Sequence, residues 1–398
     1  MTPQKHPTQY HIFPMNTCKF TKHIVIIASL VGNLIFFLSD GITYLRTKEL
    51  ELKNRTSFPK AANIEHFRRQ IFSKNLDILA TGNRPDVPKF PSGVIERIKF
   101  NLSINQPHYP FFEGGEPNWL LLSTLEDAIS RNDTSSIHSL SRVFDNAILS
   151  TNITQVDCTL GGGCAILLYK RTHDKKYRDY ADKMYRWLKG HDTEYGIIYR
   201  GNKDSRFQLN DGYGMYMPFL NMYAQVFSDT TAFNLSQKQI EIASLYLMDN
   251  VSGIPAHGFT LKNNHSKVMQ CNFGRGVAWF VLGLLNFNTS HASERCNAAI
   301  ARLDSTLCKI WENERCFTQF IGQGGERDLS AELPIMYYLM HKHLIKINDE
   351  QLLNYSTMAE NGLLYHSSGS VTTTYSNLFG PNILAQAFML KLLNEFNK

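Results

Sequence analysis

The sequence lacks the signatures of several common enzyme classes. It has no Cys-x-x-Cys pair, so a zinc site built from thiolates is not expected. It has no Asp-x-Asp motif, which disfavours a membrane-anchored glycosyltransferase that binds a metal ion. Charged residues make up only 19% of the chain, and the formal charge of +6 is spread without a basic block. We therefore expect no metal, no cofactor and no nucleic acid as a partner.

Acidic residues are absent from the beginning of the chain, where none occurs before Asp40. Lysines precede an apolar run at residues 24–38. This pattern is typical of a membrane-targeting segment whose N-terminus stays in the cytoplasm. We expect a cytoplasmic segment at residues 1–23 and a single-pass signal anchor at residues 24–45.

A cleaved signal peptide is the alternative interpretation of this segment. The small residues Ser39 and Gly41 would permit cleavage before Ile42, and the protein would then be secreted. In both cases the main domain is exported to a periplasmic, extracellular or lumenal space. Six of the seven cysteines would then lie in an oxidising compartment, which permits disulfides without fixing any pairing.

Runs of alternating strands are also missing. From Pro117 onward, apolar helical stretches alternate with connections rich in Gly, Asn and Asp. Residues 46–110 are polar and interrupted by prolines, and we expect a stem and leading helices there, with one helix at residues 64–79. The main domain would occupy residues 111–398.

Two kinds of helix are predicted in the main domain. Residues 177–188 place their apolar side chains on one face, as an outer helix does. Residues 165–169 and 277–285 are apolar nearly all round, which requires burial on most sides. The periodicity supports an all-α fold. A toroid of helical hairpins, an (α/α)6 barrel, fits the alternation of the two kinds, but this assignment depends on the family resemblance described below.

Asp211 is the best candidate for a catalytic acid. It lies in a polar, glycine-broken approach to an apolar run. Because Pro218 is comfortable in the first turn of a helix, we expect the helix to begin near Tyr216 or Met217, with Asp211 in the preceding loop. An aspartate in this setting is also common as a cap or turn residue.

Asp157 is a second carboxylate in a similar setting. Three glycines at residues 161–163 follow it and precede an apolar helix. They would let a ligand or another backbone approach closely, or they mark a helix start crowded against its neighbour. No Lys-Ser/Thr follows them, so a phosphate-binding loop is not indicated.

The stretch from residue 255 to 285 brings further candidates together. His257 and Arg275 are suited to bind a sugar carboxylate, because Arg offers a planar pair of donors and His a tunable one. Aromatic side chains that could stack on sugar faces lie in this stretch and just after Asp211, although such residues usually belong to a core. They are Trp279, Phe273, Tyr213 and Tyr216.

Taken together, these segments resemble the unsaturated glucuronyl and rhamnogalacturonyl hydrolases, glycoside hydrolase families 88 and 105. The resemblance covers roughly residues 155–393. It rests on Asp157 with its glycines, Asp211 before an apolar helix, His257-Gly258-Phe259, and Gly274-Arg275-Gly276 with Trp279.

The resemblance implies an (α/α)6 barrel and a substrate with a 4,5-unsaturated uronic acid at its non-reducing end. In these families an Asp protonates the enol-ether double bond and then activates the water that adds at carbon 5. By position, Asp211 would be that residue, with His257 and Arg275 binding substrate and Trp279 shaping the ring site. Asp157, if close, would raise the pKa of Asp211. The expected partner is an acidic oligosaccharide or polysaccharide.

The chain departs from the family pattern at Phe273, where Trp is usual, and at residues 277–278, where Asn-Gly is usual. Two alternatives therefore stay open. One is another (α/α)-barrel uronate enzyme, a lyase or an epimerase. The other is a catalytically inactive, membrane-tethered glycan-binding or assembly protein. The oligomeric state is also open.

Overall fold

The computed structural model describes residues 17–104, 111–149, 153–191, 196–198, 207–260, 266–268, 272–369 and 375–396. The chain divides into two compact units. The smaller unit comprises Met1–Glu49 and Phe90–His108, and the larger comprises Leu50–Lys89 and Tyr109–Lys398.

Six helices form the inner ring of the larger unit. They are α5 (Gly115–Ser130), α7 (Gly161–Thr172), α9 (Tyr213–Phe227), α11 (Gly274–Gly283), α13 (Leu329–His341) and α15 (Ile383–Phe396). Each packs against the next, and α15 packs back against α5, so the ring is closed. Every residue of α11 is buried, which explains why its sequence is apolar nearly all round.

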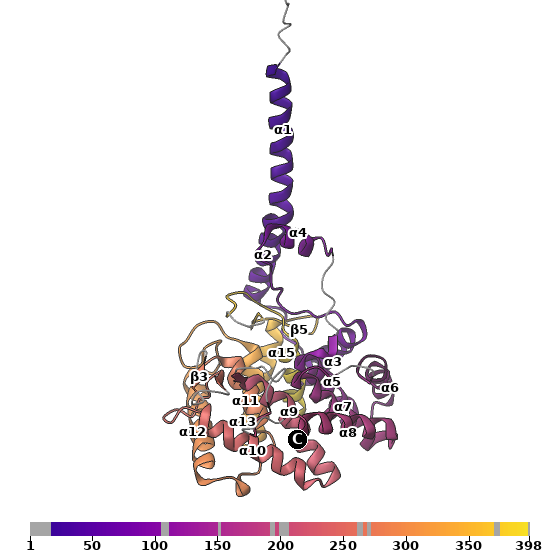
Figure 1. Ribbon diagram of the computed structural model, residues 1–398, viewed down its shortest axis with the longest axis vertical. Coiled ribbons are helices and arrows are strands. Elements are labelled where there is room, and N and C mark those ends of the chain that lie inside the picture. The colour runs from indigo at the N-terminus through magenta and orange to yellow at the C-terminus, as the bar shows by residue number, and fades with distance from the viewer. Residues whose placement is uncertain are drawn as a thin grey trace, which may run out of the picture. The chain divides into compact units, whose positions relative to one another are not determined.

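A second set of helices surrounds the ring. They are α3 (Ile64–Thr81), α6 (Thr134–Val143), α8 (Lys175–Lys189), α10 (Thr230–Tyr246), α12 (Glu294–Glu314) and α14 (Asp349–Asn354). In Figure 1, α6, α8 and α12 lie at the periphery of this unit. Along α8 the apolar side chains are buried on one face, as predicted for an outer helix. The predicted (α/α)6 barrel is confirmed.

Short elements connect the helices at the two ends of the ring. The helical turns are η2 (Phe111–Glu113), η3 (Phe144–Ile148), η4 (Val156–Leu160), η5 (Asn210–Gly212), η6 (Thr289–His291) and η7 (Tyr355–Met358). The strands are β1 (Phe207–Leu209), β2 (Gly258–Thr260), β3 (Lys267–Val268), β4 (Ala359–Glu360), β5 (Leu363–Leu364), β6 (Ser367–Ser368) and β7 (Phe379–Gly380). All their pairings are antiparallel, with β1–β2–β3 in one sheet and β4–β5 and β6–β7 in two others.

Helix α9 begins at Tyr213, so the start predicted near Tyr216 or Met217 is wrong. Pro218 lies inside the helix and has no N–H to donate to the carbonyl of Gly214, four residues earlier. The indole Nε1 of Trp119 donates to that carbonyl instead, at 3.0 Å. A tertiary contact thus replaces the missing helical hydrogen bond, which lets the helix start one turn before its proline.

The three glycines of α7 serve helix packing. A Cβ on Gly162 would lie 2.4 Å from the ring of Phe219 in α9, and one on Gly161 would lie 3.2 Å from Asn118 Oδ1 in α5. Of the two interpretations open from the sequence, the crowded helix start is the one found.

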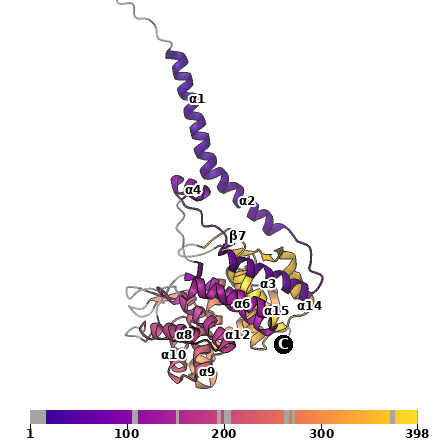
Figure 2. The same ribbon diagram turned by 90° about the vertical axis from the view of Figure 1, so that its right-hand side faces the viewer.

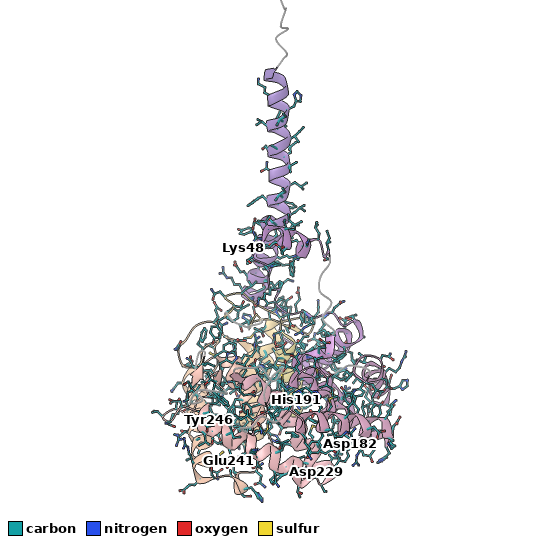
Figure 3. All side chains as sticks on the ribbon, in the orientation of Figure 1. Lys48, Asp182, His191, Asp229, Glu241 and Tyr246 are labelled. Carbon is teal, nitrogen blue, oxygen red and sulfur yellow. The ribbon has the colours of Figure 1, made fainter. Side chains whose placement is uncertain are left out.

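Polar side chains tie the outer helices to their neighbours (Figure 3). Asp182 on α8 accepts a hydrogen bond of 2.6 Å from the hydroxyl of Tyr223 on α9. Glu241 on α10 accepts one of 2.5 Å from the hydroxyl of Ser293, the cap of α12. Asp229 caps α10 by accepting from the backbone of Ala232. The first two contacts join neighbouring helices, and the third stabilises the start of α10.

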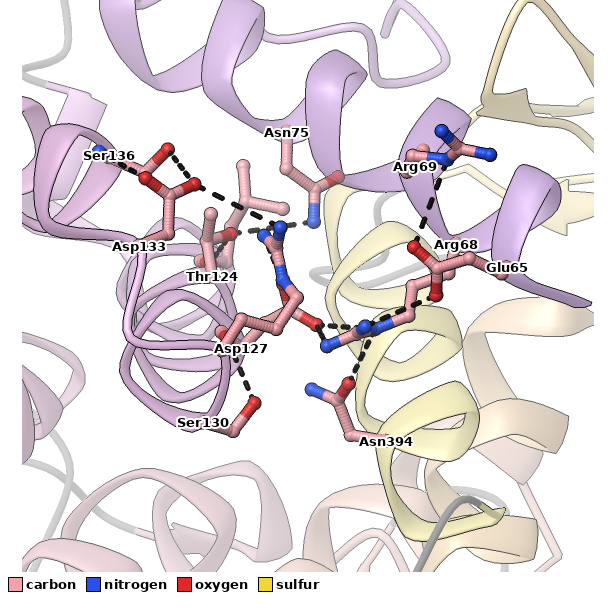
Figure 4. A network of polar contacts seen from close by, with 12 residues as sticks. Glu65, Arg68, Arg69, Asn75, Thr124, Asp127, Ser130, Asp133, Ser136 and Asn394 are labelled. Atoms are coloured by element: carbon pink, nitrogen blue, oxygen red, sulfur yellow. Dashed lines mark hydrogen bonds and ion pairs between the residues drawn. The ribbon is translucent and has the colours of Figure 1, made fainter.

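A buried carboxylate, Asp127, lies near the C-terminal end of α5 (Figure 4). Arg68 of α3 and Arg131 each place an Nη2 atom 2.7 Å from one of its oxygens. Asn394 of α15 accepts from Arg68 Nε at 3.0 Å. The network joins an outer helix to two inner helices at the end of α5 opposite Glu116.

The smaller unit contains a long, nearly continuous helix. It runs through α1 (Thr17–Phe36), the π-helical turn η1 (Phe37–Gly41) and α2 (Ile42–Arg55), whose last residues belong to the larger unit. The helix α4 (Val94–Asn101) completes the unit (Figure 2). Within the described chain, Lys22–Arg55 is the one helix that is long and apolar enough to cross a membrane, a property that signal sequences share.

Five cysteines of the described residues are free thiols. They are Cys158, Cys164, Cys296, Cys308 and Cys316. Cys271 lies outside the described residues. Burial raises the pKa of the Cys164 thiol, so this side chain behaves as a small core residue.

Candidate active site

Chemically active side chains gather at the N-terminal ends of the inner helices. Asp211 lies in η5 immediately before α9, and Asp157 lies in η4 immediately before α7. Arg275 is in the first turn of α11, and Glu116 is in the first turn of α5. Inner and outer helices alternate along the chain, so the inner helices are parallel to one another. Their N-terminal ends therefore lie on the same face of the barrel.

Asp211 and His257 form the centre of this cluster. The Nε2 atom of His257 lies 3.3 Å from Oδ1 of Asp211. The His257 side chain is 4% exposed and that of Asp211 is 15% exposed, so the carboxylate retains access from outside. The structure therefore brings together two of the residues that the sequence predicted.

Asn210 holds the segments of this pair together. Its backbone N–H donates to the carbonyl of His257 at 2.9 Å, and its Nδ2 donates to the carbonyl of Ala256 at 3.1 Å. The pairing continues into the β1–β2 ladder, where Leu209 lies opposite Gly258. Two segments that are far apart in sequence thus carry the acid and the imidazole on one backbone frame.

Asp157 is buried in the turn beside this frame. The preceding residue, Val156, packs beside Gly212, where an added Cβ would lie 3.7 Å from Val156 Cγ2. The turns that carry Asp157 and Asp211 therefore adjoin, as a coupled pair of carboxylates requires. The coupling itself stays a prediction.

Arg275 is buried and is held by two serines. Its Nε donates to Ser330 Oγ and its Nη2 to Ser368 Oγ, both at 2.9 Å. Both serine hydroxyls donate in turn to Asp328, at 2.5 and 2.6 Å. The buried carboxylate therefore fixes the orientation of the guanidinium through the serines. No sequence pattern links these residues, and the sequence analysis missed Asp328, Ser330 and Ser368.

Aromatic rings surround the imidazole. The ring of Phe273 lies 4.9 Å from the ring of His257 and 4.8 Å from that of Tyr375. The ring of Phe320 lies 5.0 Å from Tyr375. Phe273 thus lies beside His257, and its predicted contact with substrate stays a prediction. Phe320 and Tyr375 were missed, because they lie outside the helices and strands, in segments without periodicity.

The structure places Tyr213 and Trp279 in the core. Tyr213 is fully buried, and its ring contacts those of Tyr216 and Phe280. Burial raises the pKa of Tyr213. Trp279 packs on Gly214, where an added Cβ would lie 2.6 Å from its indole ring. Both side chains fix α9 against α11, and the sugar contacts predicted for them stay predictions.

Glu116 is a further candidate site residue, and it was not predicted from the sequence. Its Oε2 accepts from Arg84 Nη2 at 2.6 Å, and Arg84 also contacts Asp86 at 2.8 Å. Acidic residues are ordinarily favoured in the first turn of a helix, so the sequence gives no signal of a role for Glu116. Asp86 also accepts from the backbone of Ile383 at the start of α15, which anchors the segment that carries Arg84.

Glu116 is electrostatically part of the cluster. Burial is the main cause that raises its pKa, followed by the charge of Asp86. Arg84 and Arg275 lower the pKa, and the charge of Asp211 raises it. The carboxyl group therefore responds to both Asp211 and Arg275.

Among the described residues, no group of three or more His, Cys, Asp and Glu side chains is arranged to hold a metal ion. The cluster instead offers carboxyl groups, an imidazole and a guanidinium next to aromatic rings. This set can transfer protons and can bind a polar ring that carries a negative charge.

The fold is an (α/α)6 barrel, and a cluster of ionisable side chains lies at one end of its inner ring. The family model for Glycosyl Hydrolase Family 88 matches residues 127–377. The chain therefore belongs to this family and is a glycoside hydrolase, a divergent member as the sequence resemblance indicated. A search of the curated proteins gave no match.

Solved structures share the fold at low sequence identity. A possible family 105 member from Klebsiella pneumoniae is 12% identical with a TM-score of 0.67, over 85% of this chain and 95% of that one. A family 105 glycoside hydrolase from C. acetobutylicum is 17% identical with a TM-score of 0.61, over 72% and 94%. The unsaturated glucuronyl hydrolase of Bacillus sp. GL1 is 14% identical with a TM-score of 0.57, over 81% and 94%.

Proposed function

We propose that the protein hydrolyses unsaturated uronyl oligosaccharides by adding water across the 4,5-double bond of a non-reducing-end unsaturated uronic acid. The observation that carries the proposal is the Asp211–His257 contact, which lies in one cluster with Arg275. A carboxyl group and a fixed guanidinium at the same end of the ring match a substrate whose reactive double bond is conjugated to a carboxylate.

In the proposed reaction, Asp211 donates a proton to carbon 4 of the double bond. Positive charge develops at carbon 5, stabilised by the ring oxygen. The ionised Asp211 then takes a proton from a water molecule, whose oxygen adds to carbon 5. The resulting hemiketal opens, and the glycosidic bond breaks without attack at the anomeric carbon. One water is consumed for each bond broken.

The proton donor must hold its proton at working pH. The α9 helix N-terminus favours ionised Asp211 and opposes this requirement. Glu116 acts in the other direction, because the charges of Asp211 and Glu116 disfavour each other's ionisation. We assign to Glu116, together with Asp157, the role of keeping Asp211 protonated before the reaction.

Arg275 is assigned to the substrate carboxylate. Its Nε and Nη2 are engaged by serines, and the described residues provide no hydrogen bond to Nη1. This nitrogen is therefore the donor proposed for the substrate, with the ring orientation already fixed. Phe273 and Tyr375 supply stacking faces beside His257, and Trp279 shapes the site from behind.

The N-terminal helix is proposed to anchor the enzyme in a membrane, with the barrel exported and the N-terminus cytoplasmic. Its length and hydropathy support a span, and the preceding lysines favour this orientation. The partners are then the membrane and an acidic oligosaccharide or polysaccharide.

The test uses the full chain in detergent with unsaturated oligosaccharides made by a polysaccharide lyase. Loss of the ultraviolet absorbance of the conjugated enol acid, with no loss for Asp211→Asn, supports the proposal. A gain of absorbance on saturated polymer would identify a lyase. Binding without any spectral change would identify a glycan-binding protein.

A further inference from the structure

The apolar run of the N-terminal helix is short for a membrane span. Residues 24–38 cover about 22 Å at 1.5 Å per residue, against roughly 30 Å for a hydrocarbon core. Ser39 and Asp40 follow directly, within the π-helical turn η1. The polar turn would therefore enter the lipid unless another group covers it.

Helix α4 covers this polar turn. Asn101 Nδ2 donates to the carbonyls of Leu38 and Ser39, both at 2.9 Å. The guanidinium of Arg97 lies 3.0 Å from Asp40 Oδ1. Ser39 is buried as a result. A π-turn disturbs the regular helical hydrogen bonds, and the Asn101 side chain satisfies the two carbonyls at this point.

Apolar side chains are exposed on both sides of the turn and on α4, where Glu96 and Lys99 are exposed as well. On the long helix, four large apolar side chains at or near the turn are exposed: Phe36 before it, Phe37 at its start, and Tyr44 and Leu45 after it. On α4 the exposed side chains include Val94 and Ile95, with Ile95 64% exposed. Figures 1 and 2 both show α4 beside the junction of α1 and α2. The exposed apolar surface therefore runs from the long helix onto α4, a pattern that marks contact with lipid or protein.

We propose that α4 lies in the membrane interface and shields the polar turn, so that the apolar span continues from residue 24 to about residue 45. This length is about 33 Å, which matches a hydrocarbon core. The occupant of the apolar surface is lipid, because the surface is continuous with the exposed apolar side chains from Ile24 to Phe36 of α1. Lys99, exposed on α4, can extend its amine to the headgroups.

Depth-dependent quenching tests the placement of α4. The full chain is reconstituted in phosphatidylcholine vesicles with or without bromine on the acyl chains. Ile95→Trp adds an indole to α4, while Val251→Trp adds one at an exposed apolar position of the larger unit. The parent chain corrects for the four native tryptophans. We expect brominated lipid to quench the added Ile95→Trp emission several-fold more than that of Val251→Trp. Equal quenching of the two would overturn the proposal.

Alkaline carbonate extraction separates this proposal from that of the span itself. Release of the parent chain from vesicles would overturn both. Retention of the parent with an unquenched Ile95→Trp would overturn only the role of α4. Neither measurement uses enzyme activity, so the result is independent of the proposed reaction.

A matched pair of variants tests the shielding. Arg97→Ala leaves Asp40 without its cation, and we expect a smaller carbonate-resistant fraction than for the parent. Adding Asp40→Asn to Arg97→Ala should restore that fraction, because the charge is removed. Arg69→Ala, at an exposed arginine of α3, is the control. A carbonate-resistant fraction for Arg97→Ala equal to the parent's would contradict the shielding role.

Discussion

The carboxylate of Asp211 faces the imidazole of His257 across 3.3 Å, although the two residues are 46 positions apart. Asn210 makes this geometry possible, because its backbone and side chain both donate to carbonyls of the segment that carries His257. The barrel therefore supplies the support, and the η5 turn supplies the carboxyl group.

We expect Asp211→Asn to lower kcat on an unsaturated oligosaccharide by roughly 10²- to 10⁴-fold, the usual contribution of a general acid–base. The amide keeps the shape and can still contact His257, so the thermal midpoint should stay close to the parent's. Steady-state kinetics and thermal melts check both statements. A variant with more than a tenth of the parent's kcat would refute the assignment.

Replacing Glu116 should move the pH profile. In the proposed reaction Asp211 acts in its protonated form, so we expect activity to fall as the pH rises past the pKa of that carboxyl group. Removing the Glu116 charge makes Asp211 easier to ionise, so the alkaline limb of the kcat profile for Glu116→Gln should shift to lower pH. Glu65→Gln, at an exposed carboxylate of α3, is the control. An unshifted limb would show that Glu116 does not tune the acid.

Ser330→Ala should weaken substrate binding more than catalysis. The change removes the acceptor for Arg275 Nε, so the guanidinium loses one of the two serine hydroxyls that fix its orientation. We expect KM to rise by about 10-fold, the equivalent of roughly 1.4 kcal/mol, with a smaller change in kcat. Ser141→Ala, on the outer helix α6, is the control. A fall in kcat with unchanged KM would mean that Arg275 acts mainly in the transition state.

The ion pairs of Asp127 with Arg68 and Arg131 should affect the stability of the fold and not the activity. Asp127→Asn leaves Arg68 and Arg131 without their shared carboxylate in a buried setting. Breaking a buried ion pair typically costs about 3–5 kcal/mol, so the free energy of unfolding should fall by about that amount. Urea unfolding measures it, and Asp77→Asn, at an exposed ion pair of α3, should change it by less than about 1 kcal/mol.

Local patterns in the sequence were enough to predict the layers of the fold. Residues 277–285 are apolar on all sides, and they lie in the inner ring. Residues 177–188 are apolar on one face, and they lie in the outer layer. The pattern of apolar residues along a helix reflects how many of its sides are buried. The motif spacing also located Asp211 and His257. Contacts such as Arg275 with Ser368 were not predictable, because they join residues 93 positions apart and depend on how the ring closes.

The start of α9 also depends on a contact between residues far apart in the sequence, and the effect of that contact can be measured. The sequence predicted a later start because of Pro218, and the structure shows that Trp119 satisfies the carbonyl of Gly214. Trp119→Phe keeps most of the ring but removes this donor, so the free energy of unfolding should fall by about 1–3 kcal/mol. In a Pro218→Ala background the new N–H can bond to Gly214, and the same Trp119 substitution should cost clearly less. Urea unfolding of the four chains gives the coupling energy. Equal costs in the two backgrounds would mean that Trp119 stabilises the barrel through its ring rather than through the helix carbonyl.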